Sequence, residues 1–240
     1  MRLSKRIYKL AEKVHKGETV ADIGTDHGYV PMLLVRDGIS PAAIMSDISE
    51  GSLAKAVETF SLCGLKTDPD CFRVGDGLET IAPHEVDDII IGGLGGFTII
   101  QILSSDLEKS RSFGKIILQP RKHSGNLRFF LYTNGWDIID EDLAPEGKFV
   151  CEIITAVPAE QKKREPLYPE DDIRWKYPAE IVQADPELAG KRIGWKISSI
   201  EEQIESLRNS TADREERIRE LEEDREYLSS IIENRIDEEA

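Results

Sequence analysis

The densest group of reactive side chains lies in one short stretch, VADIGTDHGYVP, residues 20–31. A turn that only had to bend sharply would need no more than Gly24 and Gly28, because glycine accepts positive φ and lets other groups approach the backbone. Asp26 and His27 are extra in such a turn. We therefore expect a ligand to lie against this backbone while polar side chains act on it.

The spacing of the residues in this stretch indicates which ligand it binds. Asp26 and Tyr29 break the G-x-G-x-x-G pattern of dinucleotide sites, and the phosphate loop G-x-x-x-x-G-K-[ST] is missing. What remains is D-x-G-x-x-x-G, formed by Asp22, Gly24 and Gly28, the first motif of enzymes that use S-adenosyl-L-methionine. This cofactor has no phosphates, so glycines would admit its methionine part and the Asp22 carboxylate would attract its ammonium. The alternative role for Asp22 is to cap the strand end.

Two more carboxylates follow later apolar runs. Asp47 stands in IMSDIS, roughly 20 residues after Gly24, where an acidic residue accepts hydrogen bonds from ribose hydroxyls. Asp76 in VGDGLET would accept from the adenine amino group, and three such carboxylates disfavour a non-catalytic interaction protein. The predicted cofactor residues are Asp22, Gly24, Thr25, Gly28, Asp47, Ile48, Asp76, Gly77, Gly92 and Gly93.

Alternating elements must bring these residues together. Strands are predicted in TVADIG, AAIMSD, CFRVGD, DDIIIGG and KIILQP, with helices over 31–37, 51–62, 96–104 and 123–134. Apolar strands between helices indicate a parallel sheet covered on both faces, whose carboxyl ends share one edge. WDIIDEDL and KFVCEIITAV would add an antiparallel pair at the side. The pattern predicts an α/β fold, the Rossmann-like seven-stranded sheet of class I methyltransferases.

A second region is expected after residue 160. The first domain would span 1–160, and 161–240 would hold a proline-rich, charged linker and a small helical hairpin. Apolar side chains alternate spacings of three and four on either side of N-S-T-A-D near 209–213, which predicts an antiparallel coiled coil. These residues are Ile193, Ile197, Ile200, Ile204, Leu207, Ile218, Leu221, Leu228 and Ile232.

Charge narrows the class of partner. A net charge of −15 disfavours a protein that coats nucleic acid indiscriminately, but two short stretches are basic. One is a helix within 2–16, apolar on one side and ended by Gly17; the other follows KIILQP. Both are open to two interpretations, an RNA contact or a solvated surface. The predicted substrate residues are Lys5, Arg6, Lys9, Gln119, Arg121 and Lys122, with His123 beside them.

The sequence predicts neither a metal site nor a membrane-spanning segment. Cys63, Cys71 and Cys151 have no C-x-x-C spacing, so we expect buried thiols and no metal. No apolar run approaches the roughly 20 residues of a membrane span, and the N-terminus lacks an apolar signal core. We expect a cytoplasmic protein, a monomer or weak oligomer.

Several motifs of the chain together resemble those of one protein family. DIGTDHGYVP, SDISEGSLAKA, IIIGGLGG and IILQP, with the leading LSKRI and the coiled coil, resemble the bacterial tRNA (adenine-N1)-methyltransferases of the TrmK type. The resemblance implies methylation of N1 of the adenosine at tRNA position 22, with tRNA as partner. It departs at Leu94, where the family commonly has Met, and at Arg121, often Asn.

The expected chemistry suits the glycine turn. Adenine N1 has an in-plane lone pair, so the enzyme must chiefly position it. Asp26 is predicted to stabilise the cationic product. His27 is predicted to form a hydrogen bond or to accept a proton, and Tyr29 to stack on an extruded base. The alternative roles are structural. Asp26 would orient the cofactor, His27 would shape the turn, and Tyr29 would pack against its neighbours. GGLGG replaces the Asn/Asp-Pro-Pro-aromatic motif of amino-methylating enzymes; another RNA, a protein or a small molecule remains the alternative substrate.

Overall fold

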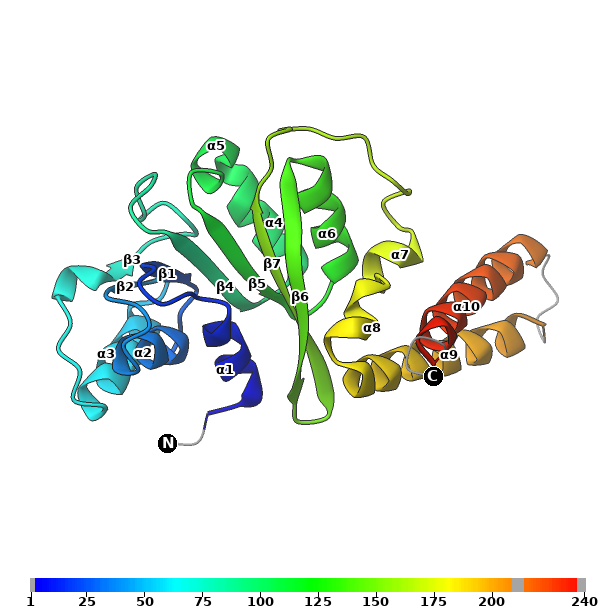
Figure 1. Cartoon of the computed structure of the whole chain (residues 1–240), viewed down its shortest axis with the longest axis horizontal. Coiled ribbons are helices and arrows are strands. Elements are labelled where there is room, and N and C mark those ends of the chain that lie inside the picture. Colours follow the sequence, from blue (N-terminus) through cyan, green and yellow to red (C-terminus); the bar gives the residue numbers. More distant parts are fainter. Residues whose placement is uncertain (1–2, 209–213, 237–240) are drawn as a thin grey trace.

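The computed structural model describes residues 3–208 and 214–236 and contains one seven-stranded sheet of order β3-β2-β1-β4-β5-β7-β6. The first five strands are parallel, whereas β7 runs antiparallel to both β5 and β6 (Figure 1). The strands are β1 (Val20–Ile23), β2 (Ala43–Asp47), β3 (Phe72–Val74), β4 (Asp88–Leu94), β5 (Lys115–Pro120), β6 (Trp136–Glu146) and β7 (Phe149–Pro158). The predicted fold class and the antiparallel pair at one side are confirmed.

Helices cover both faces of the sheet because its central strands are apolar on both sides. One core joins α1 (Lys5–Glu12), α2 (Tyr29–Arg36) and α3 (Glu50–Leu62) to the sheet through residues such as Leu10 and Ile90. The other core packs α4 (Gly96–Ser105) and α6 (Ser124–Thr133) against Ile89 and Ile91. A short α5 (Leu107–Ser110) and a single 3₁₀ turn, η1 (Pro69–Cys71), complete this part.

The N-terminal helix is shorter than expected. It ends at Glu12, and Val14 leaves it to stay buried in the core. Gly17, at φ 101°, forms the turn before β1 and does not end the helix, and residue 2 lies outside the described residues. The other four predicted helices match the structure to within two residues at each end.

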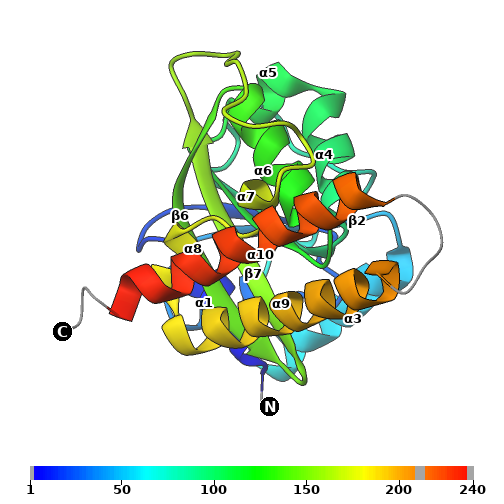
Figure 2. The same ribbon diagram turned by 90° about the vertical axis from the view of Figure 1, so that its right-hand side faces the viewer.

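The C-terminal part contains α7 (Ile173–Lys176), α8 (Glu180–Ala184), α9 (Pro186–Arg208) and α10 (Glu215–Ile236). The last two lie side by side as an antiparallel hairpin (Figure 2), and the predicted apolar positions face a shared core. The expected turn at 209–213 lies outside the described residues. Among the described helices, none carries an apolar stretch long enough to cross a bilayer.

The stretch predicted as a linker is mostly exposed over residues 160–171, and the segment that follows it packs against α6. Trp175 is buried and contacts the rings of Phe129, Tyr132 and Tyr168. The hairpin core also includes Leu143 of β6. Aromatic packing therefore fixes the segment around Trp175. The proline and charge content of the preceding stretch did not predict this contact.

Buried ion pairs add to this junction. The Arg128 guanidinium on α6 contacts Glu141 of β6 and Glu152 of β7, each at 2.6 Å. Arg192 of α9 reaches the other Glu152 oxygen, also at 2.6 Å. Although burial alone would raise the pKa of Glu152, the two guanidinium groups hold it below its usual value. We name these residues, Arg128, Glu141, Glu152 and Arg192, the junction network.

Candidate cofactor and substrate site

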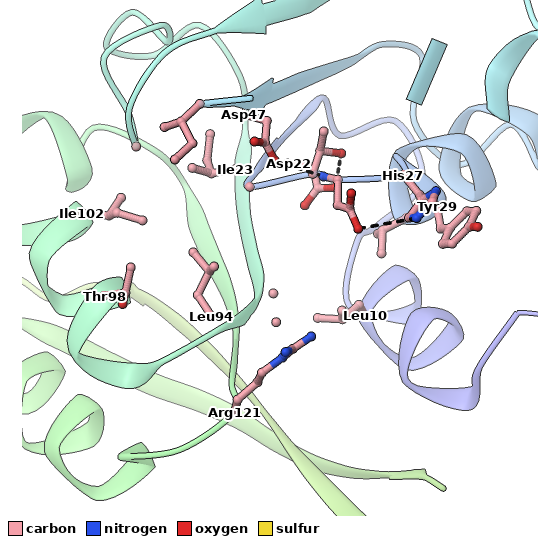
Figure 3. A pocket seen from close by; sticks show the side chains of 18 of the residues that line it. Leu10, Asp22, Ile23, His27, Tyr29, Asp47, Leu94, Thr98, Ile102 and Arg121 are labelled. Carbon is pink, nitrogen blue, oxygen red and sulfur yellow. Dashed lines mark hydrogen bonds and ion pairs between the residues drawn. The ribbon is translucent and has the colours of Figure 1, made fainter. Parts of the chain in front are cut away.

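A cavity of about 450 Å³ opens at the carboxyl edge of the parallel strands, between the ends of β1 and β4 (Figure 3). The strand order reverses at this point, which is where doubly wound sheets bind ligands. Most predicted residues line it: Arg6, Asp22, Gly24, Thr25, Asp26, His27, Tyr29, Asp47, Ile48, Asp76, Gly77, Gly92, Gly93 and Arg121. The lining does not include Lys5, Lys9, Gly28, Gln119 and Lys122.

Asp22 is the most deeply buried carboxylate of the cavity. Burial raises its pKa to about 6, although the nearby Arg6 charge opposes the shift. The Thr25 hydroxyl donates a hydrogen bond of 2.7 Å to one Asp22 oxygen. The group is therefore more than a strand cap: it is a buried carboxylate whose anionic form a cationic ligand would stabilise.

The glycine turn is held by its neighbours. Gly28 has φ 65°, and a Cβ there would lie 2.9 Å from the Ala56 Cβ of α3, so only glycine fits. Gly28 thus packs against a helix and does not line the cavity. Asp26, also left-handed at φ 47°, donates its backbone N–H to the Asp47 carboxylate at 3.2 Å. The first and second strand ends are joined by this bond.

Further predicted cofactor residues lie at or just after the ends of β2 and β3, beside the cavity. Asp47 also accepts from the Ser49 N–H at 2.9 Å, which fixes its carboxylate beside the cavity. Ile48 lies next to it with 72% of its surface exposed, an unusual exposure for isoleucine beside a site. Gly77 faces Ile102 of α4, whose side chain would lie 3.2 Å from an added Cβ. The apolar Ile48 and Ile102 and the carboxylate of Asp76 suit a purine ring and its amino group.

Asp26 has a cationic partner that was not predicted. Its carboxylate contacts the Lys55 ammonium of α3 at 2.9 Å, and this bond lowers the pKa of Asp26. The His27 ring lies 3.6 Å from the other Asp26 oxygen and stacks in parallel on Tyr29, with ring centroids 5.0 Å apart. Asp26 is thus an ionised group suited to electrostatic stabilisation rather than to proton abstraction. One face of Tyr29 is covered by His27.

Gln119, predicted to touch substrate, lies beneath the cavity with 1% of its surface exposed. Its side-chain oxygen accepts from the Gly93 N–H at 3.1 Å and from Arg6 Nη1 at 3.2 Å. The Arg6 Nε also donates to the Glu146 carboxylate at 2.9 Å. Gln119 therefore positions the β4 turn and Arg6, and its side chain does not line the cavity.

The basic face of α1 is turned against the acidic strand β6. Lys9 contacts Asp142 at 2.8 Å, while Lys13 contacts Asp140 at 2.7 Å and Asp142 at 3.0 Å. Lys5 is exposed. The signal for these pairs was present, since WDIIDEDL carries acids at alternate positions, which share one face of a strand.

The second basic stretch is different. Arg121, Lys122 and His123 are all exposed, and only Arg121 lines the cavity. Within residues 3–208 and 214–236, neither Arg121 nor Lys122 forms an ion pair. Sequence reasoning also missed Leu10, Leu94, Thr98 and Ile102 in the cavity wall, because none of them belongs to a motif that marks it as a ligand contact.

These residues fit S-adenosylmethionine in shape and charge. The buried Asp22 carboxylate suits an ammonium, Asp47 suits paired hydroxyls, and the backbone at Gly92 and Gly93 forms part of the cavity wall. A metal is not part of this fit: in the described part of the chain, no three His, Cys, Asp or Glu side chains are arranged to hold one.

Comparison with known proteins agrees with this geometry. The sequence model of the family described as "Methyltransferase domain" matches residues 3–154, more than half of the chain. The chain belongs to this methyltransferase family. The tRNA (adenine(22)-N(1))-methyltransferase of Bacillus subtilis (strain 168) is 35% identical over 156 residues, covering 65% of each chain. This aligned segment is just under two thirds of the Bacillus protein.

Solved structures extend the similarity to the hairpin. The methyltransferase matches the crystal structure of the B. subtilis M1A22 tRNA methyltransferase TrmK with a TM-score of 0.79 and 27% identity, over 96% of this chain and 99% of that one. It matches an uncharacterized protein from Listeria monocytogenes serotype 4b with a TM-score of 0.82 and 27% identity, over 96% and 100%. The family resemblance stated from the sequence is confirmed.

Proposed function

We propose that this methyltransferase transfers a methyl group from S-adenosyl-L-methionine to N1 of the adenosine at position 22 of tRNA. The observation that carries the proposal is the convergence of Asp22, Asp47 and Asp76 on one cavity that Asp26 and Tyr29 also line. The similarity to the Bacillus enzyme supports the substrate. A cytoplasmic location and a monomeric or weakly oligomeric state are part of the proposal.

The cofactor would be held by carboxylates from three strand ends and by one arginine of α1. Asp22 would bind the ammonium, Asp47 the ribose hydroxyls and Asp76 the adenine amino group. Arg6 lies close enough to Asp22 to lower its pKa, so it would face the cofactor carboxylate. When bound, S-adenosylmethionine supplies a methyl group on a positively charged sulfur.

The protein's part in the reaction is to position and to stabilise. Its walls exclude water and hold the adenine edge in line, which is the larger requirement for a ring nitrogen that is already nucleophilic. Asp26, kept ionised by Lys55, would stabilise the positive charge that develops on the methylated base. His27, which stacks on Tyr29, would receive the proton that the amino group loses, and Tyr29 would stack on the base.

The test uses purified protein, S-adenosylmethionine and unmodified tRNA transcripts, followed by nucleoside mass spectrometry. We expect 1-methyladenosine in a transcript with adenosine at position 22 and none when guanosine replaces it. Methylation of the guanosine transcript, or of no tRNA at all, would contradict the proposal; the second outcome would favour a protein or small-molecule substrate.

A paired substitution tests the role of Asp26. We expect Asp26→Asn to slow methyl transfer by roughly 100-fold, as for other preorganised charges, with cofactor affinity changed only a few-fold. Asp171→Asn, an exposed carboxylate in the 161–172 segment, is the matched control and should leave both values unchanged. Loss of cofactor binding in Asp26→Asn would instead place Asp26 in the methionine pocket.

A further inference from the structure

An exposed aromatic pair lies at the rim beside the cavity and has no part in the chemistry above. Phe97 is in the first turn of α4 and His123 immediately precedes α6; their ring centroids are 4.4 Å apart and their planes are tilted by 32°. We call them the aromatic pair. Thr98 and Arg121, their near neighbours in the chain, line the cavity opposite His27 and Tyr29 (Figure 3).

The pair is not a piece of the core that protrudes. Phe97 has 53% of its surface exposed, whereas Ile99 and Leu103 of the same helix are fully buried. Phe97 therefore lies on the outward side of α4, at its N-terminal end. A single exposed apolar residue needs no explanation. An exposed phenylalanine against an exposed histidine from a different loop, beside a substrate cavity, is a more specific arrangement.

The backbone holds the pair rigidly. The Gly96 N–H donates to the Lys122 carbonyl at 2.8 Å, and the Arg121 N–H donates to the Leu94 carbonyl at 2.8 Å. A Cβ on Gly96 would lie 2.4 Å from the His123 carbonyl oxygen, so the two turns touch along their backbones. His123 has φ 60°, a conformation that only a firm context maintains in a residue with a side chain. The platform is thus preformed.

The charges around the pair favour a polyanion. Arg121 and Lys122 are exposed beside it, and no ion pair within residues 3–208 and 214–236 uses either one. Aromatic faces flanked by unpaired cations are how proteins bind single-stranded nucleic acid, because bases stack on the rings while cations follow the phosphates. A nucleotide beside an extruded base loses a stacking partner and gains from a new one.

We propose that the aromatic pair stacks on a base adjacent to the target adenosine, with Arg121 and Lys122 on the phosphates between the two nucleotides. The inference rests on the proposed tRNA substrate. It assigns the β4 and β5 turns to the neighbouring nucleotide, while the β1 turn serves the target. Single-strand stacking is tolerant of sequence, so the pair would hold the RNA without reading a particular base.

The experiment measures steady-state kinetics with full-length tRNA and, separately, tRNA binding and cofactor binding. Replacing one stacking ring commonly costs between about fivefold and 100-fold in affinity. We expect Phe97→Ala to raise the KM for tRNA at least fivefold, with the Kd for S-adenosylmethionine unchanged. Phe97→Trp should keep the parental KM. Leu62→Ala, which truncates a side chain that is 80% exposed on α3, is the control and should change nothing.

A fluorescent base gives a readout independent of methyl transfer. tRNA carrying 2-aminopurine at position 21 or 23 should be more strongly quenched when bound to the parent than to Phe97→Ala at saturating protein. Equal KM and equal quenching in a folded Phe97→Ala variant, while the parent methylates tRNA, would overturn the aromatic pair alone. A parent that neither binds nor methylates tRNA would overturn the proposed function itself.

Discussion

The two basic stretches at the rim of the site look alike in sequence and differ in the structure. In α1 and just after it, Lys9 and Lys13 contact the acids of β6, and Arg6 contacts Glu146. The 121–123 loop remains exposed and forms no ion pair within the described residues, although Arg121 lies near enough to Glu146 to help Arg6 lower its pKa against the effect of burial. The charge density of a short segment therefore says little about a binding surface until the elements packed against it are known.

Because Lys9 and Lys13 of the first stretch are paired with acids, we expect the two basic stretches to have different roles. α1 lies alongside the tip of the β6–β7 pair (Figure 1), so its cations fasten the helix over the cavity. Arg121 of the loop also lines the cavity, while its neighbours Lys122 and His123 are exposed to solvent. We expect α1 to serve the fold and the cofactor, and the loop to serve the RNA.

The largest effect should come from reversing the loop charges. Arg121→Glu with Lys122→Glu is expected to raise the KM for tRNA by about 30-fold at low salt and to lower the salt slope of binding by one to two units, since phosphate contacts are lost. Cofactor affinity should change only a few-fold. Lys66→Glu with Lys163→Glu is the charge-matched control; an equal loss there would mean that net charge alone matters.

A smaller change is expected from Arg6→Met, and on the cofactor instead of the RNA. The Kd for S-adenosylmethionine should rise about tenfold as a charged partner is lost. Burial raises the pKa of Asp22 to about 6, and Arg6 opposes this shift, so the variant pKa should be higher. Because protonated Asp22 no longer attracts an ammonium, affinity should fall below pH 6 in the parent and at a higher pH in the variant.

Calorimetry from pH 5 to pH 8 measures the Kd for S-adenosylmethionine and its pH dependence, for the parent and for Arg6→Met. A variant with parental cofactor affinity but a tRNA KM raised tenfold would reverse the roles given to α1 and the loop.

The smallest effect on RNA should come from Lys9→Met with Lys13→Met. We expect the KM for tRNA to change less than about twofold and the free energy of unfolding to fall by about 1 kcal/mol at pH 7. Burial alone would raise the pKa of Asp142, but the two lysines lower it overall. The stability from this pair is therefore present above about pH 4, the unfolded value, and is lost as the pH falls below it.

Urea unfolding at several pH values tests this. Curves for parent and variant that stay apart below pH 3 would show that the lost packing, and not the charge, is responsible.

Much of the site could be predicted because it depends on local rules. Apolar periodicity gave the strands, and a parallel sheet places Asp22, Asp47 and Asp76 at one edge wherever its strands end. The failures concern contacts between distant segments. Lys55 meets Asp26 only because α3 packs beside the first turn, and Gln119 is buried only because α1 covers it. Neither pairing leaves a periodic trace in the chain.

The junction network has a consequence for how this protein could be divided. A chain shortened after β7 would keep Arg128, Glu141 and Glu152 but lose Arg192, and Glu152 would face the gap left by Trp175 and α9 with one counter-charge removed. Removing one partner of a buried charge is destabilising, although Arg128 would still contact Glu152. The hairpin therefore adds to the stability of the last two strands, and we expect the shortened chain to unfold more easily than the parent.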